Sequence, residues 1–185
     1  MTQILLSVQP QWAEKILNGT KTIEIRKSVP KDLPCEVLMY VTKNKSKFRV
    51  GCMEFANDDL YILPNQKLYK FGCSVEIMGC ELPYSKDNFL NGKVVAKFTL
   101  NKADTLEHCQ WVNQQVETYT PRGIISNFEI LDKACLDIVE LCAYGKGKPL
   151  YAWHIDDLVI FDQPKELGEF YITKAPMSWQ RVKGE

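Results

Sequence analysis

The sequence predicts an α+β fold, a small mixed β-barrel with flanking helices and an inserted segment. Strand-like segments number about six or more against two helical ones, with no alternating βαβ rhythm and no internal repeat of 20 to 50 residues. A chain of 185 residues, 45% of them hydrophobic, is long enough to bury the core of one globular domain. We therefore expect a single domain over residues 1–185.

The first 43 residues predict three strands and one short helix. The apolar run Ile4–Val8 is typical of a buried strand. Pro10 opens a short amphipathic helix, and Gly19 ends it. The segment Thr22–Arg26 alternates apolar and polar residues with a period of two, which predicts a strand with one apolar and one polar face. A further strand is expected over Glu36–Thr42, after two prolines.

The middle of the chain is harder to assign. Residues 44–92 contain many Asn, Asp, Pro and Gly residues between short apolar stretches, and we interpret them as a segment inserted into the main fold. The alternation over Gly92–Leu100 then restores a clear strand pattern. We expect this strand to belong to the main sheet.

The last third of the sequence predicts one helix and two or three strands. Ser126–Glu129 matches a capping box, so a helix is expected from there to about Cys142. Its expected core face consists of Ile130, Ala134, Ile138 and Leu141. The aromatic and β-branched stretch Leu150–Asp162 predicts one bent strand or two, and Met177–Val182 predicts a terminal strand.

The charge of the chain is balanced overall but locally uneven. Lys plus Arg and Asp plus Glu number 23 each, which argues against a protein that coats nucleic acid through its net charge. Residues 21–49 are an exception, with eight basic residues against three acidic ones. This basic region is either a solvated loop and strand edge or a surface that faces an anionic ligand.

Cysteine and histidine usage predicts no metal site and no disulfide framework. The seven cysteines include no CxxC pair, and only two histidines are present. We expect buried free thiols in a reducing compartment, and no motif for a cofactor is found. The N-terminus resembles no signal peptide and no apolar run is long enough to span a membrane, so we expect a cytoplasmic protein with no membrane partner.

One motif carries most of the functional information. The stretch GTKTIEIR reads as GxKxxExR, with Gly19, Lys21, Glu24 and Arg26 at the motif positions. Together with SVQPQWAEKILNG before it and YAWHIDDLVIFDQPKEL later, it resembles the ASCH domain family, a branch of the PUA-like β-barrels, and particularly the ASCH-like proteins of bacteriophages and Firmicutes. The resemblance covers residues 3–43 well and residues 93–182 more loosely.

This resemblance implies a cleft beside the first helix, where the motif charges face RNA or a nucleotide-like ligand. The fork of Arg26 suits a phosphate or a base edge, Lys21 adds a point charge, and Glu24 can accept from an exocyclic amine. Alternatively, Glu24 and Arg26 simply pair at the surface, where such a pair contributes about 0 to 1 kcal/mol.

Five further residues are candidates for ligand binding. The resemblance places Ser7 and Gln9 beside the motif, where the first strand meets the helix. Tyr151 and Trp153 share one strand face and either stack on a nucleobase or fill the core. His154, on the other face, is either a proton-transfer group or a hydrogen-bonded structural residue.

The resemblance also raises an enzymatic alternative, because some bacterial ASCH proteins are amidohydrolases that act on N4-acetylcytidine. Their proposed machinery is a Lys, a Thr three residues later and a distant Glu. Here Lys21 matches the Lys, but Glu24 replaces the Thr, and a carboxylate beside Lys21 raises the pKa of that amine and so opposes its use as a base. Glu24 could instead act as a general base on water, with Lys21 or Arg26 stabilising an oxyanion.

Three functions therefore stay open on the sequence alone. The first is an RNA- or nucleotide-binding module, and the second is an amidohydrolase acting on N4-acetylcytidine or a similar N-acylated nucleoside. The third is a protein-interaction scaffold that binds a protein partner through residues 44–92.

Overall fold

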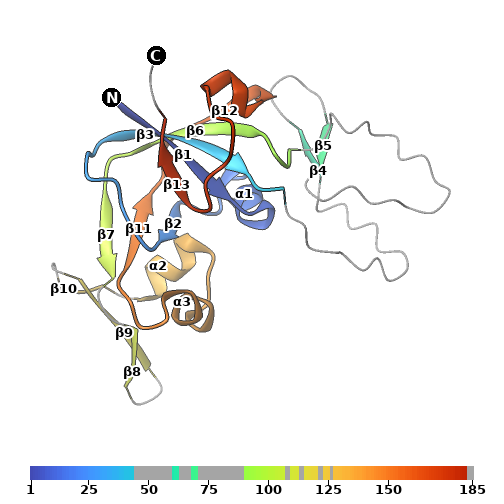
Figure 1. The fold of residues 1–185 in the computed structure, drawn as a ribbon. Helices are drawn as coiled ribbons and strands as arrows, with labels where there is room; N and C mark the ends of the chain where they lie inside the picture. Colours follow the sequence, from blue (N-terminus) through green and yellow to red (C-terminus); the bar gives the residue numbers. More distant parts are fainter. Residues whose placement is uncertain are drawn as a thin grey trace. The chain divides into compact units, whose positions relative to one another are not determined.

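The computed structural model describes residues 1–43, 60–62, 68–70, 90–106, 109–112, 115–120, 123–125 and 127–182 (Figure 1). The chain divides into two compact units. The first comprises Met1–Thr2, Lys15–Glu36 and Phe98–Leu158, and the second comprises Gln3–Glu14, Val37–Lys97 and Val159–Glu185.

Helices are interspersed among the strands along the chain. The helices are α1 (Pro10–Leu17), α2 (Asn127–Ala134), α3 (Ile138–Gly145) and the short 3-10 helix η3 (Leu167–Phe170). The strands are β1 (Thr2–Val8), β2 (Ile23–Arg26), β3 (Cys35–Val41), β4 (Leu60–Ile62), β5 (Leu68–Lys70), β6 (Val94–Leu100), β7 (Ala103–Leu106), β8 (Cys109–Val112), β9 (Gln115–Thr120), β10 (Gly123–Ile125), β11 (Leu150–His154), β12 (Asp156–Lys165) and β13 (Trp179–Arg181). The predicted α+β class is confirmed.

The second unit holds most of a five-stranded sheet in the order β12-β6-β3-β1-β13. Its core consists of Leu5, Leu38, Tyr40, Val94 and Ile172. Because β12 and β13 are the two edges of this sheet, it does not close into a barrel within the described residues. The strands predicted near the N-terminus and over Gly92–Leu100 are found here as β1, β3 and β6.

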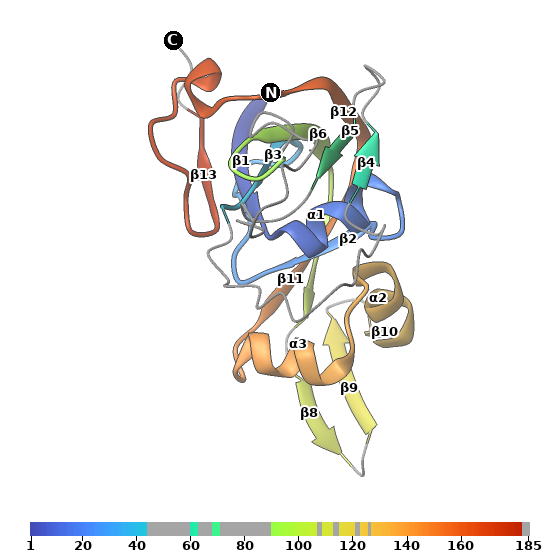
Figure 2. The same ribbon diagram turned by 90° about the vertical axis from the view of Figure 1, so that its right-hand side faces the viewer.

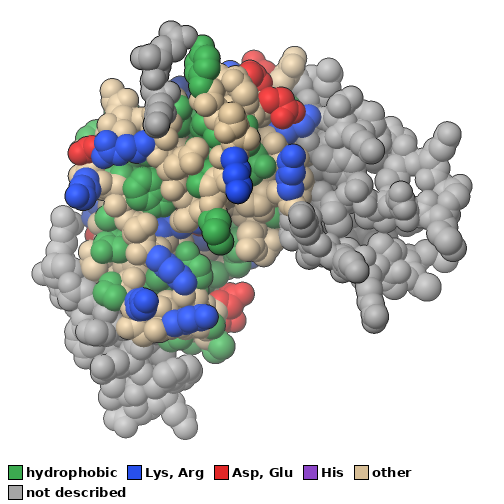
Figure 3. Space-filling model, viewed as in Figure 1, with side chains coloured by type: hydrophobic (Ala, Val, Ile, Leu, Met, Phe, Trp, Pro, Cys, Tyr) green, Lys and Arg blue, Asp and Glu red, His purple; other side chains and the backbone are tan. Residues whose placement is uncertain are grey.

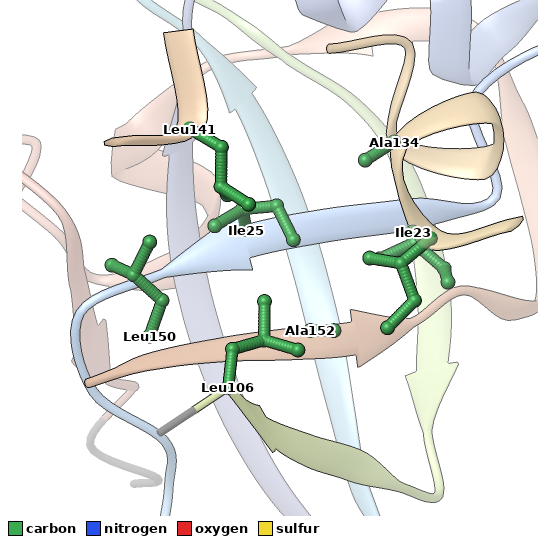
Figure 4. Packing of buried hydrophobic residues seen from close by; sticks show 8 residues of the cluster. Ile23, Ile25, Leu106, Ala134, Leu141, Leu150 and Ala152 are labelled. Carbon is green, nitrogen blue, oxygen red and sulfur yellow. The ribbon is translucent and has the colours of Figure 1, made fainter. Parts of the chain in front are cut away.

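The first unit is built on a three-stranded antiparallel sheet in the order β2-β11-β7. Helix α2 packs against β2, as Figures 1 and 2 show. The apolar side chains of β2, Ile23 and Ile25, point into a core shared with the two helices, and Ala152 lies opposite Ile25 on β11 (Figure 4). The period-two alternation of this segment therefore predicted its apolar face correctly.

The helix predicted from Ser126 to about Cys142 is instead two helices, α2 and α3. The chain leaves α2 at Cys135, whose φ of 51° lies in the left-handed region and cannot continue a right-handed helix. Asp137 then starts α3 through a capping box with Glu140, a second signal that the sequence carried in DIVE. Ser126 lies outside the described residues. Three of the expected core residues, Ile130, Ala134 and Leu141, are buried, and Ile138 packs against them partly buried.

The stretch Leu150–Asp162 is two strands, β11 and β12, and β11 pairs with both β2 and β7. Of residues 44–92, only the antiparallel pair of β4 and β5 and the last three residues are described. The proposed partner-binding role of this segment stays a prediction.

The expectation of free thiols is wrong at Cys142, which is disulfide-bonded. Cys35 and Cys135 form no disulfide bond. Sequence spacing missed this bond because disulfide pairing depends on distances in the folded chain.

No cluster of potential metal ligands occurs among the described residues, and none of the helices described is long and apolar enough to cross a membrane.

Candidate functional site

The three motif charges meet in the interior of the first unit. Glu24 lies between two cations, with its Oε1 2.8 Å from Arg26 Nη2 and its Oε2 3.3 Å from Lys21 Nζ. Lys21 is 2% exposed, Glu24 5% and Arg26 8%. We call these three residues the charged triad. Glu24 and Arg26 do pair, but in the interior and not at the surface as the alternative prediction had it.

Lys21 connects the triad to the end of helix α2. Its Nζ donates a hydrogen bond of 2.5 Å to the carbonyl oxygen of Ala134, the last residue of α2, where a positive charge is favourable. Burial lowers the pKa of Lys21, and the opposing effect of Glu24 is smaller. The sequence analysis expected Glu24 to raise the pKa of Lys21, but in the folded chain the effect of burial is larger.

The register of the sheet shows which other predicted residues share the face of the triad. Trp153 lies opposite Glu24 and Tyr151 lies opposite Arg26 in the pairing of β11 with β2. Directly opposed residues of antiparallel strands point to the same face, so all four side chains share one face of the sheet. Trp153 is 0% exposed, whereas Tyr151 is partly exposed. Trp153 is therefore a core residue, and of these two aromatic rings only Tyr151 is accessible to solvent.

His154 belongs to the opposite face of the sheet, because it pairs with Ile23. Its Nε2 lies 2.8 Å from Asp104 Oδ2, and Lys102 Nζ lies 2.9 Å from the same oxygen. Burial raises the pKa of Asp104, but hydrogen bonds and charge from Lys102 and His154 outweigh it and the net shift is downward. The structure thus places His154 in a separate polar cluster with Asp104, a partner that the sequence analysis did not identify.

Tyr144 on α3 is a neighbour of the triad that the sequence analysis missed. The Nζ of Lys27, the residue after Arg26, lies 4.7 Å from the centroid of its ring. Burial raises the pKa of Tyr144, Arg26 lowers it and Glu24 raises it, so the phenol lies in the electric field of both triad residues. No local pattern in the sequence relates position 144 to position 26, because tertiary packing alone brings them together.

The basic region of residues 21–49 divides into buried and exposed parts. Lys21 and Arg26 are buried, whereas Lys27, Lys31 and Lys43 are exposed. Residues 44–49 lie outside the described residues. Figure 3 shows lysine and arginine side chains scattered among apolar and other side chains on the face that it presents. Neither a solvated loop and strand edge nor a surface that faces an anionic ligand therefore describes the whole region.

Ser7 and Gln9 belong to the second unit. The hydroxyl of Ser7 donates to the carbonyl oxygen of Pro176 at 2.7 Å, and its amide donates to the carbonyl of Ser178. Gln9 is exposed, and its side-chain oxygen accepts from Gln11. Ser7 thus has a structural role in attaching the C-terminal segment, and ligand binding by these two residues stays a prediction.

Comparison with known proteins agrees with this architecture. Three structures from Zymomonas mobilis have a similar fold at 13–15% sequence identity and a TM-score of 0.55: an ASCH protein and two single-residue variants, Tyr to Phe and Ser to Ala. The matches cover 98–99% of this chain and 88–91% of those chains. No curated protein matches the sequence. The family model of the ASCH domain matches residues 6–124, which include the whole charged triad, and the chain therefore belongs to the ASCH domain family.

Proposed function

We propose that the protein is an RNA- or nucleotide-binding module whose ligand contacts β2, the strand that carries Glu24 and Arg26 of the charged triad. The observation that carries this proposal is the burial of Lys21, Glu24 and Arg26 in one ion cluster. Burying charges costs solvation energy, and apolar residues of similar volume are often as stable in such positions. Two basic groups around one carboxylate also leave an excess of positive charge, which suits an anionic ligand.

The three residues have different roles in this proposal. Lys21 is held by Ala134 and Glu24, so it positions the carboxylate. Glu24 in turn orients the guanidinium of Arg26. Arg26 is the most exposed of the three, and it offers a planar fork to a phosphate or a base edge. Tyr151, opposite Arg26, provides a ring on the same face.

The test is a titration with a short single-stranded RNA at two salt concentrations. Arg26→Ala should weaken binding and reduce the slope of log affinity against log salt by about 1, as expected for the loss of one phosphate contact. Arg26→Lys keeps the charge without the fork, and Lys133→Ala removes an exposed lysine of α2 as a control. If Arg26→Ala folds and binds RNA as the wild type does, the proposal is wrong.

One observation favours the amidohydrolase as a second candidate. The lowered pKa of Lys21 increases the fraction of neutral amine, which is the form that a general base requires. Glu24 at the position of the family's Thr is the feature against it. Incubation with N4-acetylcytidine should yield cytidine, with a rate that rises with pH as Lys21 loses its proton. Absence of turnover at high enzyme concentration would remove this candidate.

We further infer that the chain is one ASCH domain of PUA-like type with an insertion at about residues 44–92, located in the cytoplasm and acting without a cofactor. The family model matches residues 6–124 as one range that spans this segment, which supports a single domain.

A further inference from the structure

The charged triad by itself offers little surface to a ligand. Lys21 and Glu24 are nearly inaccessible, and Trp153 on the same sheet face is fully buried. A ligand of Arg26 must therefore make most of its contacts with neighbouring side chains that reach solvent. In the part of the first unit that the structure describes, two such neighbours are Lys27 and Tyr144.

Tyr144 combines accessibility with proximity to the triad. The residue is 38% exposed although it lies on α3, whose Leu141 belongs to the core. The electric fields of Arg26 and Glu24 both reach its phenol. An aromatic ring that is partly exposed and anchored on a helix provides a stacking platform with little conformational freedom to lose.

Lys27 supplies an exposed positive charge beside Tyr144. Its Nζ lies over the Tyr144 ring at 4.7 Å, and a cation–π contact at an exposed site is weak. A phosphate is a stronger partner for an ammonium group, because the hydrogen bond is charge-assisted. Together with the triad, Lys27 makes three basic side chains against the single carboxylate of Glu24.

We propose that Tyr144 and Lys27 recognise a phosphorylated nucleoside, with its base stacked on the Tyr144 ring and its phosphate bound by Lys27. This inference rests on the proposed nucleotide-binding function and specifies which residues contact the ligand and which chemical groups they read. In this arrangement Lys27 moves from the ring to the phosphate, and Arg26, the preceding residue in the chain, adds a second positive charge. The same chemistry is present in a free nucleotide and at the 5′ end of an RNA.

The experiment is calorimetric titration of the full chain with cytidine monophosphate, cytidine, inorganic phosphate and a 5′-phosphorylated tetranucleotide. The wild type should bind the monophosphate roughly 10-fold more tightly than cytidine, the usual effect of one charge-assisted contact. Tyr144→Ala should weaken binding of both by roughly 5- to 150-fold, the range for loss of one stacked base. Tyr144→Phe should bind as the wild type does, because it keeps the ring.

Lys27→Ala should abolish the difference between cytidine monophosphate and cytidine, whereas Lys31→Ala, an exposed lysine in the same segment, should not. Equal affinity for the monophosphate and the tetranucleotide supports a free nucleotide as ligand, and tighter binding of the tetranucleotide supports an RNA end. If Tyr144→Ala binds as the wild type does while Arg26→Ala does not, this inference fails and the proposed function stands. If the wild type binds neither nucleotides nor RNA, both fail.

Discussion

The carboxylate of Glu24 lies 2.8 Å from the guanidinium of Arg26, and both residues are more than nine-tenths buried. Glu24 also neutralises Lys21, so it is the single negative charge between two buried cations. Removing one partner of a buried ion pair leaves the others without compensation, which is far more costly than loss of a surface pair. This relationship makes Glu24 the most sensitive position of the triad.

Glu24→Gln should lower the free energy of unfolding by about 3 to 5 kcal/mol, because Lys21 and Arg26 then repel each other in the interior. Urea denaturation followed by circular dichroism measures this change. Glu129→Gln is the control, since Glu129 pairs with Lys133 on the surface of α2 and its loss should leave the midpoint unchanged. A loss at Glu24 no greater than that of the control would contradict the structural role given to the triad.

Lys21 should make stability rise with pH in the alkaline range. Its pKa is lowered in the folded chain by burial, so between that value and about 10.5 the unfolded chain binds more protons than the folded one. The free energy of unfolding should therefore increase as pH rises through this window. Lys21→Met should remove this increase in the free energy of unfolding. The test is to measure unfolding of the wild type and of Lys21→Met from pH 8 to 10.5. Equal slopes for the two proteins would show that Lys21 does not titrate abnormally.

Asp104 should make stability fall as the pH is lowered in the acidic range. Its folded-state pKa is lowered, mainly because Lys102 and His154 together outweigh the effect of burial. Its contribution to stability is present above about pH 4 and is lost as pH falls through the lowered value. Asp104→Asn should lose less stability than the wild type between pH 4 and pH 2. Identical acid limbs in the two unfolding profiles would refute the ion cluster with His154.

The end of helix α3 offers a test of the backbone geometry. Lys146 caps this helix with a φ of 51°, in the left-handed region. This conformation is energetically unfavourable for any residue that has a Cβ atom, whereas glycine adopts it readily. Lys146→Gly should therefore stabilise the protein by about 0.5 to 1 kcal/mol. Gly147→Ala, at a φ of 72°, should destabilise it. Thermal unfolding of the two variants should show shifts of opposite sign, and shifts of the same sign would contradict this geometry.

The local patterns of the sequence predicted what depends on local geometry. Alternation in Thr22–Arg26 identified the apolar face of β2, because successive strand residues point to opposite faces, but it did not reveal that the polar face is buried as well. The same rule placed Tyr151 and Trp153 on one face of their strand, but it did not reveal that Trp153 is fully buried. The break at Cys135 was missed because the helical periodicity continues on both sides of it. Tyr144 was missed because only packing brings α3 near Arg26.

The most direct test of the central claim is an NMR titration of the full chain with cytidine monophosphate, observing the side chains of Arg26 and Tyr144. The account predicts that the Arg26 guanidinium and Tyr144 ring resonances shift together and saturate at one common affinity. Saturable shifts confined to other residues, with Arg26 and Tyr144 unchanged, would contradict it.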